Sequence, residues 1–161
     1  EYHLYTLPRP ATVLMNEMKQ LSLLEATNVP IQKVIIFDPM RNYRGWQPNE
    51  GEVGSGVLKP IVQYKITNKK DSNMGMPMPA GKFKIYQRDS EGATQLVGED
   101  RIEHTPADET IKLNVGRAFD IVAERKRTDF KYVYGSSRSP IGATESFVTE
   151  LRNRKKTAET V

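Results

Sequence analysis

Hydrophobic and polar residues alternate in short runs along most of this chain. Val, Ile, Leu, Phe and Tyr recur at every second position, and Pro, Gly, Asn and Asp separate one run from the next. A period of two is typical of β-strands that bury one face, and the period of an amphipathic helix is almost absent. The pattern predicts an all-β, antiparallel β-sandwich-like fold. The expected strands are Tyr2–Thr6, Ala11–Met15, Lys19–Ala26, Gln32–Phe37, Val57–Thr67, Lys82–Arg88, Gln95–Val97, Arg101–His104, Thr110–Leu113, Arg117–Arg127, Lys131–Tyr134 and Glu145–Arg152.

One of these segments fits a helical turn as well as a strand. Asn16–Leu24 has moderate helical character, but Leu21 and Leu23 alternate with the polar residues Gln20 and Ser22. That alternation favours the strand.

The clearest unit is a β-hairpin around the stretch DSEG, Asp89–Gly92. Asp at the first position and Gly at the fourth are typical of a type I turn that closes with a left-handed residue. Lys82–Arg88 is therefore expected to pair with Ala93–Val97. Phe83 and Ile85 would face the core, and the opposite face would carry Lys82, Lys84 and Tyr86.

A second long strand is expected in the stretch RAFDIVAERKR, Arg117–Arg127. Its alternation places three apolar side chains on the inner face and two acidic ones on the outer face. The inner residues are Phe119, Ile121 and Ala123, and the outer residues are Asp120 and Glu124.

Two segments rich in Gly and Pro are expected to be long connections, Asp38–Gly56 and Gly135–Thr144. The first contains Trp46, the single tryptophan of the chain, and loops of this kind often carry recognition on a β scaffold. Trp46 is therefore a candidate ligand-binding residue. The alternative, which we favour slightly, is that both segments are mobile insertions.

The composition narrows the picture only a little. A chain of 161 residues indicates one domain, or one domain and a piece of another. The net charge of +4 is partly concentrated in RNRKK, Arg152–Lys156, and is weak evidence for an anionic partner. Without cysteine there is neither a disulfide nor a thiolate metal site. No apolar run is long enough to cross a bilayer.

Three methionines precede the hairpin, at Met74, Met76 and Met78. Thioethers are soft ligands for Cu(I), but the intervening prolines favour polyproline II geometry, in which residues two apart do not share a face. Methionine is also an ordinary filler of apolar cores. We therefore expect these side chains to pack and no cofactor to be bound. The next stretch, MPAG, predicts a type I turn with Pro79 at its second position.

Acidic residues and one histidine gather between Gly98 and Glu109. Such oxygen-rich clusters bind hard cations, and one imidazole could join a transition-metal site, but the spacing matches neither an EF-hand nor the two-histidine helical zinc motif. A polar turn between two short strands also explains the composition, and we favour it. The ligand-binding candidates of this segment are Glu99, Asp100, His104, Asp108 and Glu109; Glu103 lies among them.

Catalysis leaves no specific signal in the sequence. There is no nucleophile elbow, and a serine triad would have to use His3 or His104, neither of which lies near a plausible nucleophile. A carboxylate pair for glycoside cleavage is not visible in sequence, because only its spatial separation identifies it. No catalytic residue is predicted, and a non-enzymatic role is favoured.

Basic and aromatic residues interleave in RKRTDFKYVY, Arg125–Tyr134. Grooves for single-stranded nucleic acid have this pattern. Cationic residues also protect the edges of long strands against stray pairing. The second explanation is the commoner one, so no nucleic-acid partner is expected.

Three motifs together resemble a known family: YHLYTLPRPATV, GMPMPAGKFKIYQRDSEGATQLVGEDRIEHTPADE and VGRAFDIVAERKRTDF. The family is a bacterial one without an assigned function, which forms the C-terminal part of proteins similar to mucoidy inhibitor A. The likeness extends over roughly Tyr2 to Arg154. It implies a β-rich protein of the cell envelope, periplasmic or secreted, whose leader and N-terminal half lie outside this sequence. It supplies no catalytic residue.

In that family the run matching ESFVTELRNRKK opens a further immunoglobulin-like module. The resemblance thus implies a β-rich domain over residues 1–144, followed by 145–161 as the start of a second module or an exposed tail that borrows a partner strand. Our first functional hypothesis is a non-enzymatic, envelope-associated scaffold or interaction module that binds a protein partner by strand-edge pairing. The alternative is a metal-dependent or hydrolytic activity on envelope polymers through residues 99–109.

Overall fold

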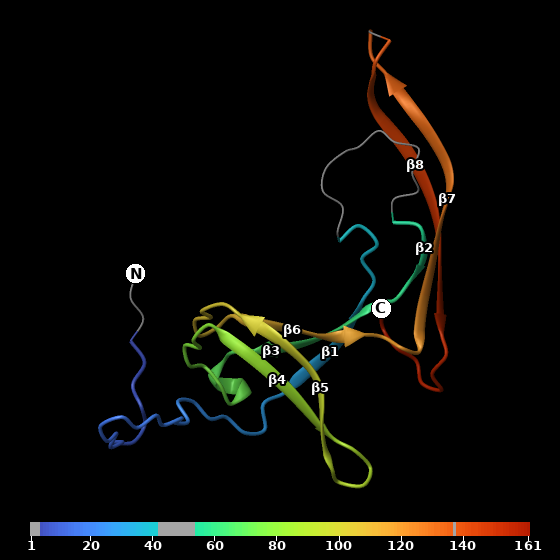
Figure 1. The fold of residues 1–161 in the computed structure, drawn as a ribbon. Coiled ribbons are helices and arrows are strands. Elements are labelled where there is room, and N and C mark those ends of the chain that lie inside the picture. Colours follow the sequence, from blue (N-terminus) through green and yellow to red (C-terminus); the bar gives the residue numbers. More distant parts are fainter. Residues whose placement is uncertain (1–3, 42–53, 137) are drawn as a thin grey trace.

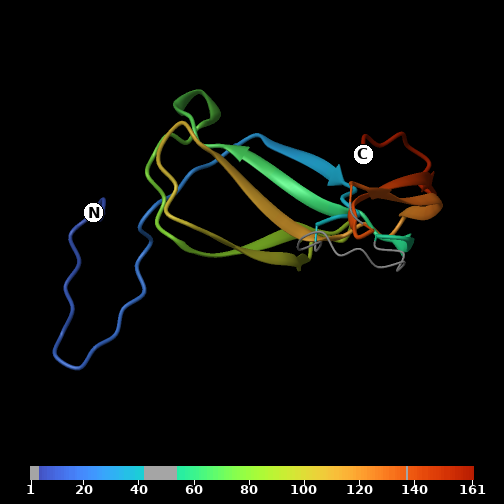
Figure 2. The same cartoon turned by 90° about the horizontal axis from the view of Figure 1, so that it is seen from above.

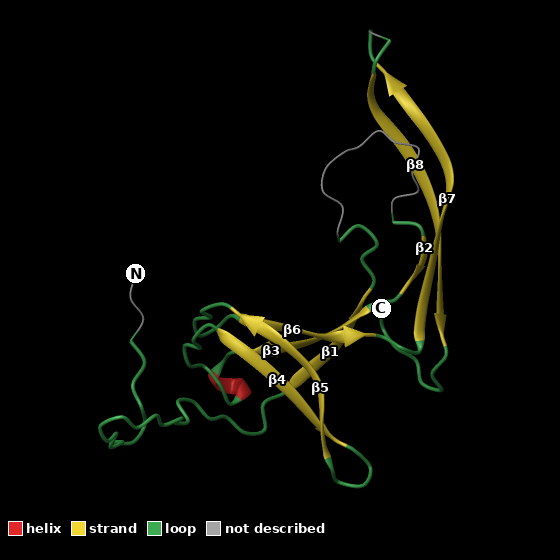
Figure 3. Cartoon of the chain, viewed as in Figure 1, coloured by secondary structure: helices red, strands yellow, loops and turns green. Residues whose placement is uncertain are grey.

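The computed structural model describes residues 4–41, 54–136 and 138–161. The fold is all-β and antiparallel, as the alternation predicts, and the one helical element among these residues is a single 3₁₀ turn (Figure 3). The elements are β1 (Ile31–Ile36), β2 (Gly56–Leu58), β3 (Ile61–Thr67), η1 (Lys70–Ser72), β4 (Gly81–Arg88), β5 (Thr94–Ile102), β6 (Thr110–Arg117), β7 (Ile121–Tyr134) and β8 (Pro140–Asn153).

A small two-layer sandwich lies between the N-terminal arm and the β7-β8 end of the molecule (Figures 1 and 2). One layer is the sheet β1-β3-β6, and the other is the hairpin β4-β5. Strand alternation directs every second side chain of both layers into the space between them. The buried residues there are Ile66, Ile102, Ile111 and Leu113, and the side chains packed around them include Tyr64, Phe83 and Ile85.

The hairpin has the expected turn and facing. The Asp89 N–H donates to the Ala93 carbonyl, and Gly92 closes the turn at φ +86°. Arg88 pairs with Thr94, and the ladder continues to Gly81 opposite Ile102. Strand β5 thus combines two segments that the sequence pattern predicts as separate strands, Gln95–Val97 and the start of Arg101–His104. The strand remains continuous because a β-bulge opposite Ile85 and Tyr86 accommodates the change of register next to Gly98.

Gly98 lies where β5 passes closest to β6. A Cβ atom added at this residue would lie 2.4 Å from the carbonyl oxygen of Val115 and 2.9 Å from its Cγ1. Only glycine allows the two backbones to approach this closely. The glycine therefore fixes how the two layers of the sandwich meet.

The chain passes between the sandwich and the other three-stranded sheet after β1, between β2 and β3, and between β6 and β7. Pro60 divides the expected strand Val57–Thr67, so that β2 and β3 belong to different sheets. Near the break between β6 and β7, the Ala118 N–H donates to the Pro60 carbonyl at 2.8 Å. A second apolar cluster fills this junction between the sheets, with Ile35, Ala118 and Ile121 buried and Val62 beside them.

Phe119 does not lie on the inner face of a strand, as the sequence pattern predicts, because the strand structure is interrupted between β6 and β7 at this residue. Its side chain is 82% exposed, with the Lys59 ammonium 5.4 Å from the ring centre. Alternation restarts only at Ile121, so the prediction is right for Ile121 and Ala123, which are buried, and wrong for Phe119. The inward and outward alternation of one strand cannot be extended past the end of that strand.

Beyond the junction, β7 and β8 form a long two-stranded ribbon, with the short β2 paired to the base of β7 (Figure 1). A bulge at Thr128 joins two expected strands into one. Strand β8 begins at Pro140, so the expected connection Gly135–Thr144 is shorter than predicted. The expected boundary after residue 144 falls inside β8, and residues 145–153 find their partner strand in the same chain.

Residues 4–30 form an extended arm that contains no strand (Figure 2). The strands expected at Ala11–Met15 and Lys19–Ala26 are wrong, as is the described part of Tyr2–Thr6. The helical alternative at Asn16–Leu24 is absent as well. A strand is stabilised by its neighbour, and no other strand of the chain pairs with these segments within the described residues.

Candidate functional site

Glu99 and Asp100 lie on opposite faces of β5, in keeping with strand alternation. The Glu99 carboxylate is exposed and lies 3.2 Å from the Lys82 ammonium across the hairpin. Asp100 points the other way, and its Oδ2 accepts the backbone N–H of Asn114 at 2.6 Å and the Asn114 side-chain amide at 3.1 Å. Asp100 therefore attaches β5 to β6.

His104 follows the end of β5 and contacts the N-terminal arm. Its Nδ1 lies 3.2 Å from the Tyr5 hydroxyl and 3.4 Å from the backbone nitrogen of Ala80, and the two rings stack with centres 6.3 Å apart. The imidazole thus holds the arm against the start of β4.

Asp108 and Glu109 belong to the loop before β6, and their backbones bond to Asn68. The Asp108 N–H donates to the Asn68 carbonyl at 2.7 Å, and the Glu109 carbonyl accepts the Asn68 N–H at 2.9 Å. Asp108 itself adopts a left-handed backbone, with φ of +69°. These two residues shape a loop.

Asn68 is the fully buried polar residue at the centre of this region, with 0% of its surface exposed. Its side-chain amide donates to the carbonyls of Met76 at 2.8 Å and Pro106 at 2.9 Å. Its Oδ1 accepts the N–H groups of Gly75 and Met76. One side chain therefore ties the methionine segment to the loop before β6.

The methionines divide between packing and backbone contacts. Met74 and Met78 pack against the sandwich core, as the packing prediction has it, while the backbone of Met76 bonds to Asn68. The Met78 carbonyl accepts the Thr105 N–H across an isolated β-bridge, and Thr105 accepts in return. That bridge brings the segment to the start of β4.

The five candidates between Glu99 and Glu109 consequently serve four separate local contacts. Among the described residues, no group of three or more His, Asp or Glu side chains is placed to hold a metal ion. Trp46, the remaining candidate, lies outside the described residues, as does most of the connection Asp38–Gly56.

Arg125, Arg127 and the aromatic residues of β7 share one face of the ribbon, whereas Lys126 and Lys131 alternate with them. The Arg125 guanidinium lies 3.5 Å from the ring centre of Phe147, and the Arg127 guanidinium lies 4.8 Å from that of Phe130. Phe130 in turn contacts Tyr132 edge to face, with ring centres 4.8 Å apart. The aromatic rings are therefore occupied by contacts within the ribbon.

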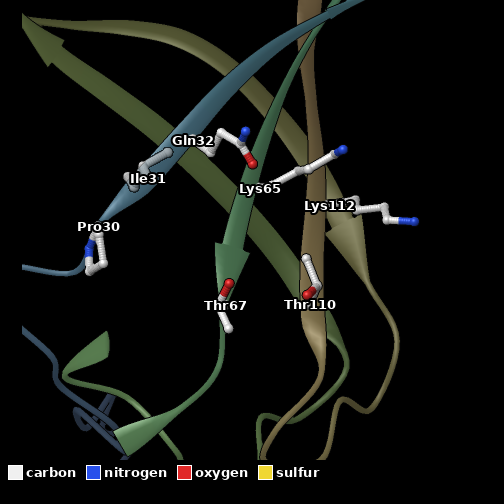
Figure 4. A pocket seen from close by; sticks show the side chains of 7 residues that line it. All are labelled: Pro30, Ile31, Gln32, Lys65, Thr67, Thr110 and Lys112. Carbon is white, nitrogen blue, oxygen red and sulfur yellow. The ribbon is translucent and has the colours of Figure 1, made fainter. Parts of the chain in front are cut away.

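An open groove of about 660 Å³ lies on the face of the β1-β3-β6 sheet that points away from the core (Figure 4). Alternation explains its lining, since each lining residue of β3 and β6 neighbours a core residue such as Ile66 or Ile111. Sequence reasoning missed this site, because cross-strand pairing brings together residues far apart in sequence. The lining residues are Pro30, Ile31, Gln32, Lys65, Thr67, Thr110 and Lys112.

Within the described ranges, no helix has the length and apolar character needed to span a membrane. No family model, curated protein or solved structure matches this chain. The resemblance to the envelope family therefore stays a prediction.

Proposed function

We propose that this chain is a non-enzymatic interaction module that binds a protein partner by adding a strand to the free edge of β8. The supporting observation is its exposed surface of 12,784 Å². A compact monomer of 18.3 kDa is expected to expose roughly 8,100 Å². The excess is several times the roughly 800 Å² that each partner buries in a standard interface.

Exposed apolar side chains support the same proposal. Among the described residues, 19 large hydrophobic side chains are exposed, whereas the buried core contains eight apolar residues. Isolated exposed hydrophobic residues are normal, but more than twice as many exposed as fully buried ones indicates surfaces that a partner covers. Three of these side chains lie on β8, at Ile141, Val148 and Leu151.

Comparison of the free strand edges favours β8. Strand β1 offers six residues, and β4 carries Lys82, Lys84 and Arg88, the kind of charge that blocks edge pairing. Strand β8 has 14 residues and pairs only with β7 among the described strands. From Ile141 to Leu151 it contains no lysine, arginine or proline. Of these three edges, β8 is the longest and has no lysine, arginine or proline in its central part, which favours strand addition there.

Location in the cell envelope is part of the proposal and rests on the motif resemblance. The alternative is a metal-dependent or hydrolytic activity at residues 99–109. The contacts of these side chains do not support it, because the side chains bond to the hairpin, to β6 and to the N-terminal arm.

Site-specific photocrosslinking in cells tests the proposal. A photoreactive amino acid replaces Val148 on β8, which is 59% exposed, and the matched control replaces Tyr86 on β4, which is 55% exposed. Irradiation followed by cell fractionation is expected to give a discrete adduct with one protein at position 148, in the envelope fraction. The Tyr86 position is expected to give little product.

Equal labelling at the two positions, or no adduct at either, would contradict strand addition at β8. An adduct confined to the cytosolic fraction would contradict the envelope location and leave the binding edge supported.

A further inference from the structure

The groove on the outer face of the sandwich sheet contains an unusual pair of like charges. Lys65 of β3 lies directly opposite Lys112 of β6 in the antiparallel register. Directly opposed residues have Cβ atoms only about 5 Å apart, and like charges in that position destabilise a sheet. An acidic neighbour would offset the repulsion between the two lysines.

Neither lysine has such a neighbour here. The ion pairs of the described residues involve other cations, and none of their carboxylates lies within 4.0 Å of the Lys65 or Lys112 ammonium. On the other side of Lys65, the residue of β1 that pairs with it is Gln32, which carries no charge. The protein thus leaves two positive charges side by side without internal compensation.

The next row of the sheet adds two hydroxyl groups. Thr67 lies opposite Thr110, two residues along each strand from the lysines, so the four side chains frame a patch of roughly 5 by 7 Å. Figure 4 shows all four on the same side of the sheet, with Gln32 beside Lys65. Ammonium, hydroxyl and amide groups can all donate hydrogen bonds at this patch.

We propose that the Lys65–Lys112 patch binds a tetrahedral phosphate-type oxyanion, either free or as a phosphate monoester on a larger molecule. A dianion offsets both ammonium charges at once, and its several oxygens can accept hydrogen bonds from the ammonium, hydroxyl and amide groups around the patch. A carboxylate has one charge and two oxygens, so it satisfies only part of the same donors. The patch lies on the sheet that β8 does not belong to, and the proposal is independent of strand addition.

Phosphate binding is tested by thermal unfolding of the whole chain in inorganic phosphate and in sodium chloride at equal ionic strength. At ten times the dissociation constant, binding raises the folding equilibrium constant about eleven-fold. We expect the midpoint to rise by a few degrees more in phosphate than in chloride. Nuclear magnetic resonance is expected to show phosphate-dependent shifts centred on Lys65, Thr67, Thr110 and Lys112.

The Lys112→Gln variant separates binding from stability. Without phosphate it should unfold at the same temperature as the parent or higher, because the like-charge contact is gone. In phosphate it should lose the additional rise. Lys84→Gln removes one exposed lysine from the other layer and is expected to keep the phosphate response.

Equal responses to phosphate and chloride, or a response that survives Lys112→Gln, would overturn the proposal. So would resonance shifts in the parent that centre outside the patch. Glycerol phosphate and phosphatidic acid vesicles then distinguish the source: a response to the soluble ester alone supports a free ligand, and a stronger response to vesicles supports a lipid-borne phosphate.

Discussion

Asn68 holds together the end of the sandwich at which the methionine segment meets the loop before β6. Its four side-chain hydrogen bonds satisfy backbone groups of two loops that are separated by about thirty residues of sequence. Buried backbone groups that lose such a partner cost free energy, because no water replaces it.

Replacing Asn68 with Ala is therefore expected to lower the free energy of unfolding by about 3 kcal/mol. Urea denaturation measures the change. Gln87→Ala on the exposed face of β4 is the control and should stay within about 0.5 kcal/mol of the parent. A loss for Asn68→Ala as small as the control's would show that the two loops hold together without this side chain.

Gly98 contributes to stability because the absence of a side chain lets β5 and β6 approach each other closely. In Gly98→Ala the new Cβ would meet the Val115 carbonyl oxygen at 2.4 Å, so β5 has to move away from β6. We expect a loss of about 2 kcal/mol in unfolding free energy, in the range of overpacked cores. Gly81→Ala, also in the hairpin, meets no atom within 4 Å and serves as the matched control in the same denaturation series. Equal stability of the two variants would contradict the close approach.

These two residues show where sequence reasoning ends at the residue scale. Gly92 is recognisable because a turn is a local feature, fixed by four consecutive residues. The roles of Asn68 and Gly98 depend on Pro106 and Val115, which only the three-dimensional fold brings close. The acidic residues Glu99 to Glu109 are close in sequence, but strand alternation directs Glu99 and Asp100 to opposite faces of β5, and Asp108 and Glu109 lie in the loop before β6.

At the scale of elements, the β4-β5 turn gives a pH-dependent contribution to stability. The pKa of Asp89 is lowered, chiefly by the side-chain hydrogen bond from Gln95. Desolvation, the next cause, acts the other way, and the backbone N–H groups of the turn lower the pKa further. A carboxyl whose pKa is lower in the folded state stabilises the fold above its unfolded pKa, about 3.9, and loses that effect as pH falls through the folded pKa.

The stability difference between the parent and Asp89→Ala is thus expected to be largest above about pH 4 and to shrink as the solution is acidified. Denaturation from pH 7 down to pH 2 measures this difference. Ser90→Ala changes the same turn at a residue that does not titrate, so its difference from the parent should not follow this curve. A parent-to-Asp89→Ala difference that stays constant or grows in acid would contradict the role of the carboxylate.

The elements that could be predicted are those with local signals. The hairpin follows from its turn and alternation, and β1 and the start of β6 follow from alternation alone. Residues 4–26 have equally good alternation and form no strand. Alternation only indicates which face of a strand is apolar, and it does not show whether a neighbouring strand is present to pair with it. The split at Pro60 was marked in the sequence by the proline itself, which cannot donate to a ladder.

At the scale of the whole molecule, the protein is a small sandwich with two extensions. The arm of residues 4–30 carries exposed apolar side chains such as Met18, which is 98% exposed, and the ribbon extends from the junction on the other side (Figure 1). Both proposals need this open arrangement, because the free edge of β8 and the outer face of β1-β3-β6 are accessible only if the extensions do not fold over them.

Small-angle X-ray scattering of the purified chain, extrapolated to infinite dilution, measures this arrangement directly. A compact chain of 161 residues has a radius of gyration of about 15 Å. The open arrangement predicts a clearly larger radius and an extended tail in the distance distribution. A radius near 15 Å would mean that the monomer covers its own edges, and it would contradict the interaction module.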